Sequence, residues 1–416
     1  MTPRELLLTR FQTAIAAVEP AAAVHAALHR DGDWLHCGSW RHRITGRVVV
    51  IGAGKASAPM ALAIEELLGD YLTRGCIVVK YGHTAVLKHL HLYEAGHPVP
   101  DAAGEIGAQA IEAAVHGLTA DDLVICCLSG GASSLLPAPR SPLTLADKQA
   151  LTKLLLASGA DIHAVNTVRK HLSRLKGGRL ANICAPATVL TLAISDVPGD
   201  DLSIIGSGPT TQDGSTPDEA LAIIARYLPP DHIPPAVQTV LAQAPTIATA
   251  DFSRVHQHII ASNQLAIGAV GADAFVDDAL AGEAQLAAAR FCQRAVELPP
   301  GSLLVAGGET TVTLGERPGL GGRNQEFALA AARWIHAHHA PLTVLAAGTD
   351  GNDGPTDAAG GLVDDSSWQR AMTAGLDPQS ALDGHDAYPL LLAIGDLVKT
   401  GPTNTNVMDL ALAYRS

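Results

Sequence analysis

Short runs of β-branched and other apolar residues alternate along the chain with segments in which apolar residues recur at helical spacing. Residues 47–51 read RVVVI, and residues 55–68 then place Met60, Ile64 and Leu67 three or four positions apart. Gly69 follows at the position where a glycine would end such a helix. A second apolar run occupies residues 75–79. Strand, helix and fully apolar strand in this order predict a parallel sheet covered by helices on both faces.

The same alternation continues to the end of the chain. Residues 122–128 form another apolar run, Pro142 and Thr144 open a helix that ends near Gly159, and residues 188–194 form a further strand. An N-terminal helix is expected from Leu7, Phe11, Ile15 and Val18. A proline-rich stretch at residues 228–245 precedes a second series, with strands near residues 258–261, 303–306 and 343–346. We therefore expect an α/β fold of two domains, residues 1–245 and 246–416, with a C-terminal tail that could return to the first domain.

Composition narrows the function classes. The chain has 416 residues, of which 47% are hydrophobic and 17% charged, as in a compact enzyme. A net charge of −13 opposes binding to nucleic acid, so no nucleic-acid partner is expected. The six cysteines form no C-x-x-C pair, which favours a reducing compartment, and the sequence shows neither a signal peptide nor an apolar run long enough to span a membrane. We expect a cytoplasmic protein, monomeric or homodimeric.

The first candidate phosphate loop is IGAGKA, residues 51–56. Gly52 and Gly54 would let backbone amides approach a phosphate, and Lys55 would add a full positive charge at a helix start. The stretch lacks the third glycine of a dinucleotide fingerprint and the spacing of a P-loop. A purely structural turn is the alternative interpretation.

The second candidate is LSGGASSLL, residues 128–136, which directly follows an apolar strand. Its backbone amides could form an anion-binding nest. We assign the phosphates to Ser129, Gly130, Gly131, Ser133 and Ser134. A nucleophilic serine is the rival interpretation, but the G-x-S-x-G elbow of hydrolases is not met.

A third loop, ISDVPGDD at residues 194–201, places Asp196 directly after a strand. A carboxylate there could hold Mg²⁺ or accept the proton of an attacking hydroxyl group. Turn capping is the alternative, and it is stronger for Asp200 and Asp201, which follow Gly199.

The second half contains AGGETTV (residues 306–312), GLGGRNQE (319–326) and AAGTDGNDGPTDAAGG (346–361). Arg323 follows a glycine-rich turn, where its planar guanidinium could clamp a carboxylate or phosphate. We assign Glu309 and Asn324 to the substrate with it, and Asp350 and Asp353 to a metal. The missing closing Glu and Pro355 disfavour a calcium-binding EF-hand and leave a Mg²⁺ or substrate loop open.

These blocks, together with GHPVPD (96–101), VRKHLSRLKGGRLA (168–181) and TGPTNTNVMDL (400–410), resemble the glycerate 2-kinase family, whose C-terminal part is the MOFRL domain. The resemblance runs from about Leu6 to Leu410 in the family's order. It implies a larger Rossmann-like domain, a smaller α/β domain and an active site in the cleft between them. Lys55 and Arg323 match the family's basic active-site positions. One local departure is His385-Asp386-Ala387-Tyr388, where the family usually has Asn-Asp-Ser-Tyr.

The resemblance implies transfer of the γ-phosphoryl group of ATP to the C2 hydroxyl of D-glycerate, with a divalent metal such as Mg²⁺. In this hypothesis Lys55 and the serine loop hold ATP, Arg323 holds the substrate and Asp196 orients the hydroxyl group. Two alternatives remain open. An NAD(P)-dependent hydroxypyruvate reductase would expect an acidic residue where the second strand ends with Lys80. A non-catalytic ligand-binding protein on the same fold is the other.

Overall fold

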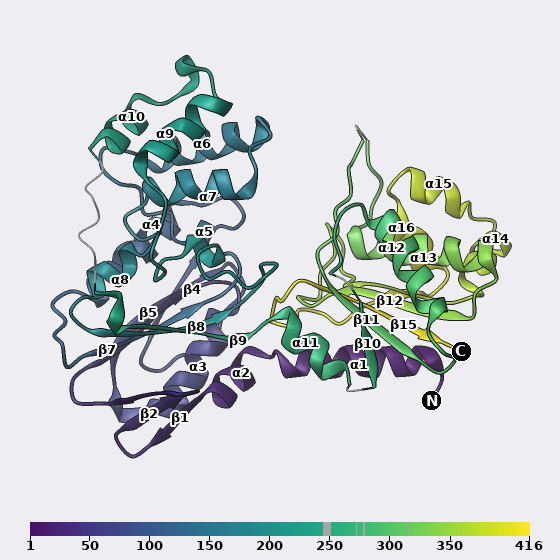
Figure 1. Cartoon of the computed structure of the whole chain (residues 1–416), viewed down its shortest axis with the longest axis horizontal. Coiled ribbons are helices and arrows are strands. Elements are labelled where there is room, and N and C mark those ends of the chain that lie inside the picture. The colour runs from purple at the N-terminus through teal and green to yellow at the C-terminus, as the bar shows by residue number, and fades with distance from the viewer. Residues whose placement is uncertain (244–250, 272, 278, 316) are drawn as a thin grey trace. The chain divides into compact units, whose positions relative to one another are not determined.

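The computed structural model describes the chain except residues 244–250, 272, 278 and 316, and its described part forms two compact units (Figure 1). The larger unit spans Pro20–Ile260. The smaller unit combines Met1–Glu19 with Ala261–Ser416. This is a two-domain α/β protein with a parallel sheet in its larger unit, as expected from the sequence.

The larger unit is built on a sheet with the strand order β6-β5-β4-β7-β8-β9. Neighbouring strands run parallel from β6 through β8. The strands are β4 (Val48–Ala53), β5 (Leu72–Lys80), β6 (His91–Ala95), β7 (Leu123–Leu128), β8 (Thr188–Ile194) and β9 (Val255–Ala261). Every residue of β4, β7 and β8 is buried, since helices cover both faces of the sheet.

The helices of this unit begin and end at the signals that the sequence contains. Helix α3 ends at Gly69, which has φ +54°, and α6 begins after Thr144, whose hydroxyl accepts the Asp147 N–H. These two predictions and the strand predictions at residues 47–51, 75–79, 122–128 and 188–194 are confirmed. The helices are α2 (Pro20–Ala27), α3 (Ser57–Leu68), α4 (Ala102–Ala114), α5 (Ala132–Leu135), α6 (Leu145–Ala157), α7 (Ile162–His171), α8 (Arg179–Cys184), α9 (Pro217–Tyr227) and α10 (Pro235–Ala242), with single 3₁₀ turns at Gly69–Tyr71, Ile205–Ser207, Pro230–His232 and Phe252–Arg254.

Two parts of the larger unit were not expected from the sequence. An antiparallel sheet of β1 (Leu28–Asp31), β2 (Trp34–Cys37) and β3 (Trp40–Arg43) precedes β4. Helices α6, α7, α9 and α10 form a separate apolar cluster at one end of the unit (Figure 1). The prolines of the expected linker begin helices here, because proline suits the first helical turn.

The smaller unit contains a mixed sheet with the strand order β10-β11-β15-β12-β13-β14. Its strands are β10 (Ala274–Val276), β11 (Leu303–Gly308), β12 (Leu342–Gly348), β13 (Gly360–Val363), β14 (Leu397–Val398) and β15 (Asp409–Arg415). The last strand, β15, pairs antiparallel with both β11 and β12. The C-terminal tail is therefore the centre of this sheet.

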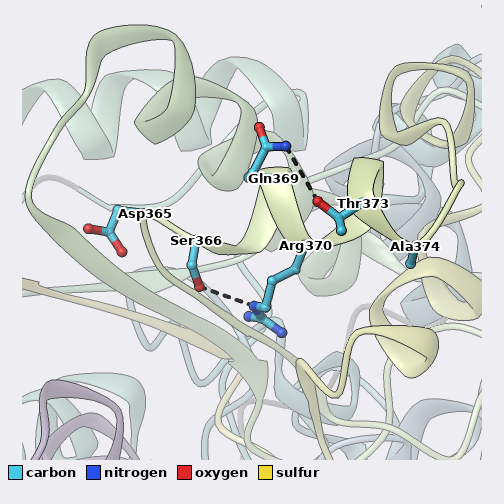
Figure 2. Close-up of a pocket in the computed structure, with 6 residues that line it drawn as sticks. All are labelled: Asp365, Ser366, Gln369, Arg370, Thr373 and Ala374. Carbon is cyan, nitrogen blue, oxygen red and sulfur yellow. Dashed lines mark hydrogen bonds between the residues drawn. The ribbon is translucent and has the colours of Figure 1, made fainter.

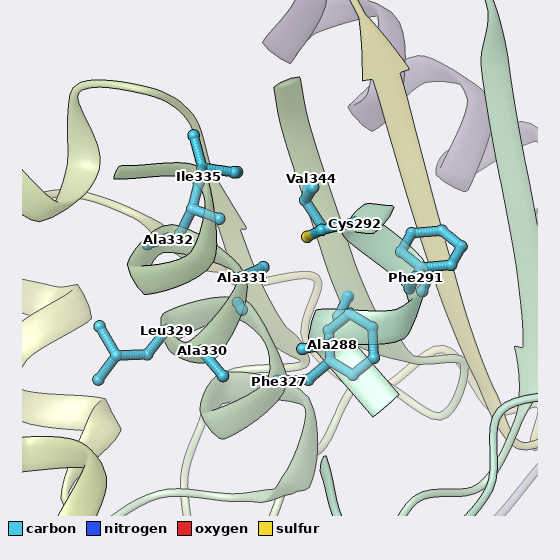
Figure 3. Close-up of a cluster of buried hydrophobic side chains, with 14 of the residues drawn as sticks. Ala288, Phe291, Cys292, Phe327, Leu329, Ala330, Ala331, Ala332, Ile335 and Val344 are labelled. Carbon is cyan, nitrogen blue, oxygen red and sulfur yellow. The ribbon is translucent and has the colours of Figure 1, made fainter. Parts of the chain in front are cut away.

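Helices pack on this sheet through small and aromatic side chains. Figure 3 shows the core, where α12 and α13 meet and the rings of Phe291 and Phe327 lie 5.9 Å apart between centroids. Alanines of α13 allow close approach of the helix to the strands. The helices are α1 (Pro3–Ala17), α11 (Asn263–Val270), α12 (Ala284–Glu297), α13 (Arg323–His338), α14 (Ser367–Thr373), α15 (Pro378–Asp383) and α16 (Ala387–Ala393).

Helix α1 determines where the division between the units falls. Its buried face, Leu7, Phe11 and Ala14, packs with α11 and β15 of the smaller unit. The described residues divide at 19/20 and 260/261. The expected boundary at 245/246 falls in residues 244–250, which lie outside the described part of the chain. Helix α1 joins the smaller unit because an apolar helix face joins whichever core buries it, irrespective of its position in the chain.

A buried carboxylate anchors the start of α1. Asp396 accepts hydrogen bonds from Arg4 (2.7 Å), Arg370 (2.8 Å) and Ser367 (2.6 Å). Removal of one member of such a network leaves the others unpaired. We expect Asp396→Ala to lower the free energy of unfolding by roughly 3 kcal/mol. Thermal unfolding would measure this, with the exposed neighbour Asp365→Ala as the control; equal midpoints for the two variants would contradict the prediction.

Candidate functional site

In the larger unit, predicted site residues gather at the carboxyl ends of neighbouring parallel strands. Gly54 and Lys55 follow β4, Ser129 to Ser134 follow β7, and Asp196 follows β8. In an open parallel sheet this edge is where ligands bind. The structure thus brings to one edge the three loops that the sequence analysis selected in this half of the chain.

The first two loops lie against each other. A Cβ atom on Gly54 would come within 2.0 Å of the Ser129 Oγ, and the φ of Gly54 is +142°, so only glycine is accommodated there. The Lys55 N–H donates to the Gly130 carbonyl at 2.9 Å. The Ser129 Oγ accepts the Ala56 N–H at 3.0 Å and is buried. Ser129 therefore fixes one loop on the other.

The remaining part of the second loop contains backbone donors that have no protein acceptor among the described residues. Gly131 has φ +87° and begins the single turn α5. Among the described residues, neither the Gly130 N–H nor the Gly131 N–H donates to a protein acceptor. Ser133 Oγ lies 2.9 Å from Ser207 Oγ, and Ser134 Oγ donates to the Pro98 carbonyl at 2.8 Å. Two adjacent backbone donors therefore remain next to Lys55, as an anion-binding nest requires.

The charge around this nest is positive. Burial, together with the neighbouring Lys55 and Lys80, lowers the pKa of His97 to about 4. His97 lies against Gly131 and is neutral near pH 7. The lysines therefore supply the positive charge near Gly131. Asp196 stands half-buried on the loop after β8, as a carboxylate at the same sheet edge.

In the smaller unit, Arg323 is the centre of a charged cluster. It is the first residue of α13, and its Nε and Nη2 donate to the two carboxylate oxygens of Asp409 at 2.6 and 3.0 Å. Its Nη1 donates to the exposed Glu309 at 2.5 Å. Burial opposes the charge of Arg323, but the Asp409 hydrogen bonds outweigh it and raise the pKa. The guanidinium is charged at every accessible pH.

Asp353 caps α13, and Asn324 is one of the helix residues that donate to it. The Asp353 carboxylate accepts the backbone N–H groups of Asn324 (3.1 Å) and Gln325 (2.8 Å), and both Asp353 and Asn324 are buried. Burial outweighs these hydrogen bonds and raises the pKa of Asp353 to about 6. Asp350 differs, since it is half-buried on the loop after β12 and accepts the Asn352 N–H. The geometry thus gives Asp353 and Asn324 a structural role in placing Arg323.

The sequence analysis missed Asp409. It is the first residue of β15, lies opposite Gly308 in the register with β11, and is buried. The quoted motif TGPTNTNVMDL contains it, and an acidic residue directly before a fully apolar strand was the available signal. Only the pairing of β15 with β11 shows that it reaches Arg323.

The HDAY segment also has a defined role. Asp386 accepts the Leu320 N–H at 2.7 Å, which fixes the glycine-rich loop before Arg323. His385 Nδ1 lies 2.9 Å from Glu326 on α13. His385, which stands where the family usually has Asn, therefore makes a polar contact with α13, the helix that carries Arg323.

A hollow of about 610 Å³ beside α14 is separate from these residues (Figure 2). It is lined by Asp365, Ser366, Gln369, Arg370, Thr373 and Ala374. Its basic residue, Arg370, is already bound to Asp396, and no predicted site residue lines it. We assign no ligand to this hollow.

Comparison with known proteins agrees with these motifs. A family model described as a domain of unknown function (DUF4147) matches residues 6–242, and the MOFRL family model matches residues 302–409. A Pyrococcus horikoshii protein named glycerate 2-kinase is 37% identical over 99% of this chain and 97% of its own length. The chain belongs to the MOFRL-domain glycerate kinase family. A solved structure titled glycerate kinase, from Thermotoga maritima, matches this family member with a TM-score of 0.87 and 36% identity over 99% of both chains.

The names within this glycerate kinase family are not uniform. An Agrobacterium vitis protein named "Putative hydroxypyruvate reductase" is 42% identical over 99% of this chain and 94% of its own length. The names of relatives therefore do not decide between glycerate phosphorylation and hydroxypyruvate reduction.

Proposed function

We propose that this protein is an ATP-dependent kinase that phosphorylates the C2 hydroxyl of D-glycerate and yields 2-phosphoglycerate and ADP. The observation that carries the proposal is the pair of unused N–H donors at Gly130 and Gly131 beside Lys55, because donors without protein acceptors next to a lysine suit a phosphate chain. Family membership supplies the substrate class. Lys55 would neutralise charge that develops on the transferred group.

On the substrate side, Arg323 would hold the carboxylate or the transferring phosphoryl group. Asp409 is buried and fixes two nitrogens of its guanidinium, while Glu309 is exposed and contacts the third. We propose that the substrate displaces Glu309 from Nη1, since an exposed ion pair contributes little and exchanges readily. Asp196 would orient the C2 hydroxyl group and accept its proton.

The family implies a divalent metal, and part of the predicted donor set fits Mg²⁺. Mg²⁺ is held in kinases by one or two carboxylates with water and substrate phosphates. Within the described residues, no group of three or more His, Cys, Asp or Glu side chains is placed to hold a metal ion by itself. Asp196 in the larger unit and Asp350 in the smaller unit are each half-buried carboxylates on a strand-end loop, so each is a candidate ligand, whereas Asp353 already caps α13. When bound, Mg²⁺ would neutralise the phosphate oxygens.

Reduction of hydroxypyruvate is the second candidate, because a close relative carries that name. The geometry favours it less. Strand β5 ends at Lys80, where a dinucleotide site expects an acidic residue for the ribose, and the loop after β4 has two glycines instead of three. Loss of absorbance by NADH or NADPH on addition of hydroxypyruvate would favour the reductase.

The decisive experiment is ³¹P NMR of the products from ATP, Mg²⁺ and D-glycerate. We expect a 2-phosphoglycerate resonance and stoichiometric ADP. Activity should disappear with excess EDTA and return with added Mg²⁺. A 3-phosphoglycerate resonance would overturn the C2 assignment, and ATP consumption without any phosphorylated acid would overturn the kinase proposal.

The setting of the enzyme is also a proposal. The six cysteines are free and buried, which agrees with a reducing cytoplasm. In the described part of the chain, no helix combines the length and apolar character that crossing a bilayer requires. We propose a cytoplasmic enzyme that acts as a monomer or homodimer, and size-exclusion chromatography with light scattering would decide between these two states.

A further inference from the structure

A buried lysine donates hydrogen bonds to the second phosphate loop, residues 128–136. Lys176 is 2% exposed, and its Nζ donates to the carbonyls of Ser133 (2.7 Å) and Leu136 (3.2 Å). These carbonyls belong to α5 and its end, so the ammonium group fixes the turn that follows Gly131. Burial, with the neighbouring Lys148 and Arg169, lowers the pKa of Lys176 well below its usual value.

A second lysine lies beside it. Lys148, on α6, is also buried, and its Nζ donates to the Pro137 carbonyl. Burial, followed by the charges of Arg169 and Arg174, lowers the pKa of Lys148 to about 7. Both ammonium groups are hydrogen-bonded to backbone carbonyls, and neither forms a salt bridge within the described part of the chain. Two buried lysine side chains therefore contact the backbone of residues 133–137.

Arg169, on α7, completes this cluster. Its charge acts on both Lys148 and Lys176, so its guanidinium lies near both ammonium groups. The neighbouring cations are paired, Lys170 with Asp213 at 3.4 Å and Arg174 with Glu112 at 2.9 Å. Arg169 is half-buried and has no side-chain hydrogen bond or ion pair to any described residue.

The turn of α7 that carries Arg169 also contacts the phosphate loop. Asn166 lies three residues earlier, on the same helix face, and its Oδ1 accepts the Ser207 hydroxyl at 3.2 Å. Ser207 Oγ in turn lies 2.9 Å from Ser133 Oγ. Hydroxyl and amide groups therefore connect this face of α7, which also carries Arg169, with the loop.

We propose that Arg169, backed by Lys148 and Lys176, binds an oxyanion, either the carboxylate of the acid substrate or a phosphoryl group. Arg169 keeps its charge, and a partly buried guanidinium without a carboxylate partner among the described residues is costly. A bound anion would offset that cost and would favour the protonated form of both lysines. A guanidinium binds two oxygens of such a group at once. The inference deepens the proposed function, on which the choice of ligands rests, but it concerns residues that have no role in the mechanism above.

The test is isothermal titration calorimetry on the full chain with D-glycerate, inorganic phosphate and ADP, each alone. Arg169→Gln should weaken at least one of them roughly 10- to 100-fold, the effect of losing hydrogen bonds to a charged group. Arg169→Lys keeps the positive charge but loses the planar guanidinium group, so its affinity should lie between those of the wild type and of Arg169→Gln. Arg226→Gln is the matched control, because Arg226 is exposed on α9, and it should leave all three affinities within twofold.

The arms of the experiment separate the sources of the anion. If the substitution weakens the binding of D-glycerate alone, the bound anion is the carboxylate of the substrate. If it weakens the binding of phosphate and ADP, the bound anion is a phosphoryl group. The proposal is overturned if folded Arg169→Gln binds all three ligands within twofold of wild type, or if wild type binds none of them. Wild-type binding that depends on Arg169 but yields no phosphorylated glycerate in the NMR experiment would refute the kinase and leave the anion site standing.

Discussion

Replacing Lys55 by methionine should lower kcat/KM for D-glycerate phosphorylation roughly 10²- to 10³-fold, the usual effect of removing one preorganised charge from a transition state. The loop itself should persist, because hydrogen bonds that do not involve the Lys55 side chain hold it: the Lys55 N–H donates to the Gly130 carbonyl and the Ala56 N–H donates to Ser129 Oγ. Methionine preserves most of the volume of the side chain. A coupled assay of ADP release at varied D-glycerate would measure the effect.

The matched control for Lys55→Met is Lys153→Met. Lys153 is exposed on α6, away from the strand ends, and its replacement makes the same change in net charge. Activity of Lys55→Met within threefold of the Lys153→Met protein would remove Lys55 from the catalytic assignment.

Replacing Arg323 by methionine should have two separable effects. Turnover should fall by roughly two to three orders of magnitude, since the proposed clamp on substrate is lost. In addition, the buried Asp409 would lose both nitrogens that it binds, and leaving such a carboxylate unpaired costs about 3–5 kcal/mol of stability. Steady-state kinetics measures the first effect, and thermal unfolding measures the second.

Two further variants separate these effects. Arg333→Met removes an arginine from the same helix, α13, where its guanidinium donates to the Gln285 side chain at 3.3 Å, and it should retain activity. The double variant Arg323→Met with Asp409→Leu removes the unpaired carboxylate, so it should recover stability without recovering turnover. Recovery of turnover in the double variant would show that Arg323 acts only through the fold.

Much of the larger unit could be predicted from the sequence because its signals are local. Predominantly apolar runs at residues 48–53, 123–128 and 188–194 indicate strands in the middle of a covered sheet. Thr144 and Gly69 mark helix ends by their own chemistry. In parallel α/β units the loops after such strands share one edge. The gathering of Lys55, Ser129–Ser134 and Asp196 at that edge follows from this rule.

The roles within the loops were less predictable. Ser129 was assigned to phosphate from its place in a serine-rich turn, but its hydroxyl accepts the Ala56 N–H and connects two loops. Asp353 was assigned to a metal from its place in an acidic loop, yet it caps α13. A polar side chain in a turn serves backbone groups and ligands equally well, and only its neighbours in space decide between them.

The sequence by itself determined the α/β class, the main strands of the parallel sheet, the loops at its carboxyl edge and the family. Only the tertiary structure decided that α1 joins the smaller unit, that β15 lies between β11 and β12, and that Asp409 binds Arg323. The physical reason is the range of the interactions. Strand and helix signals act over a few residues, whereas Arg323 and Asp409 are 86 residues apart in the chain and meet only when the sheet is complete.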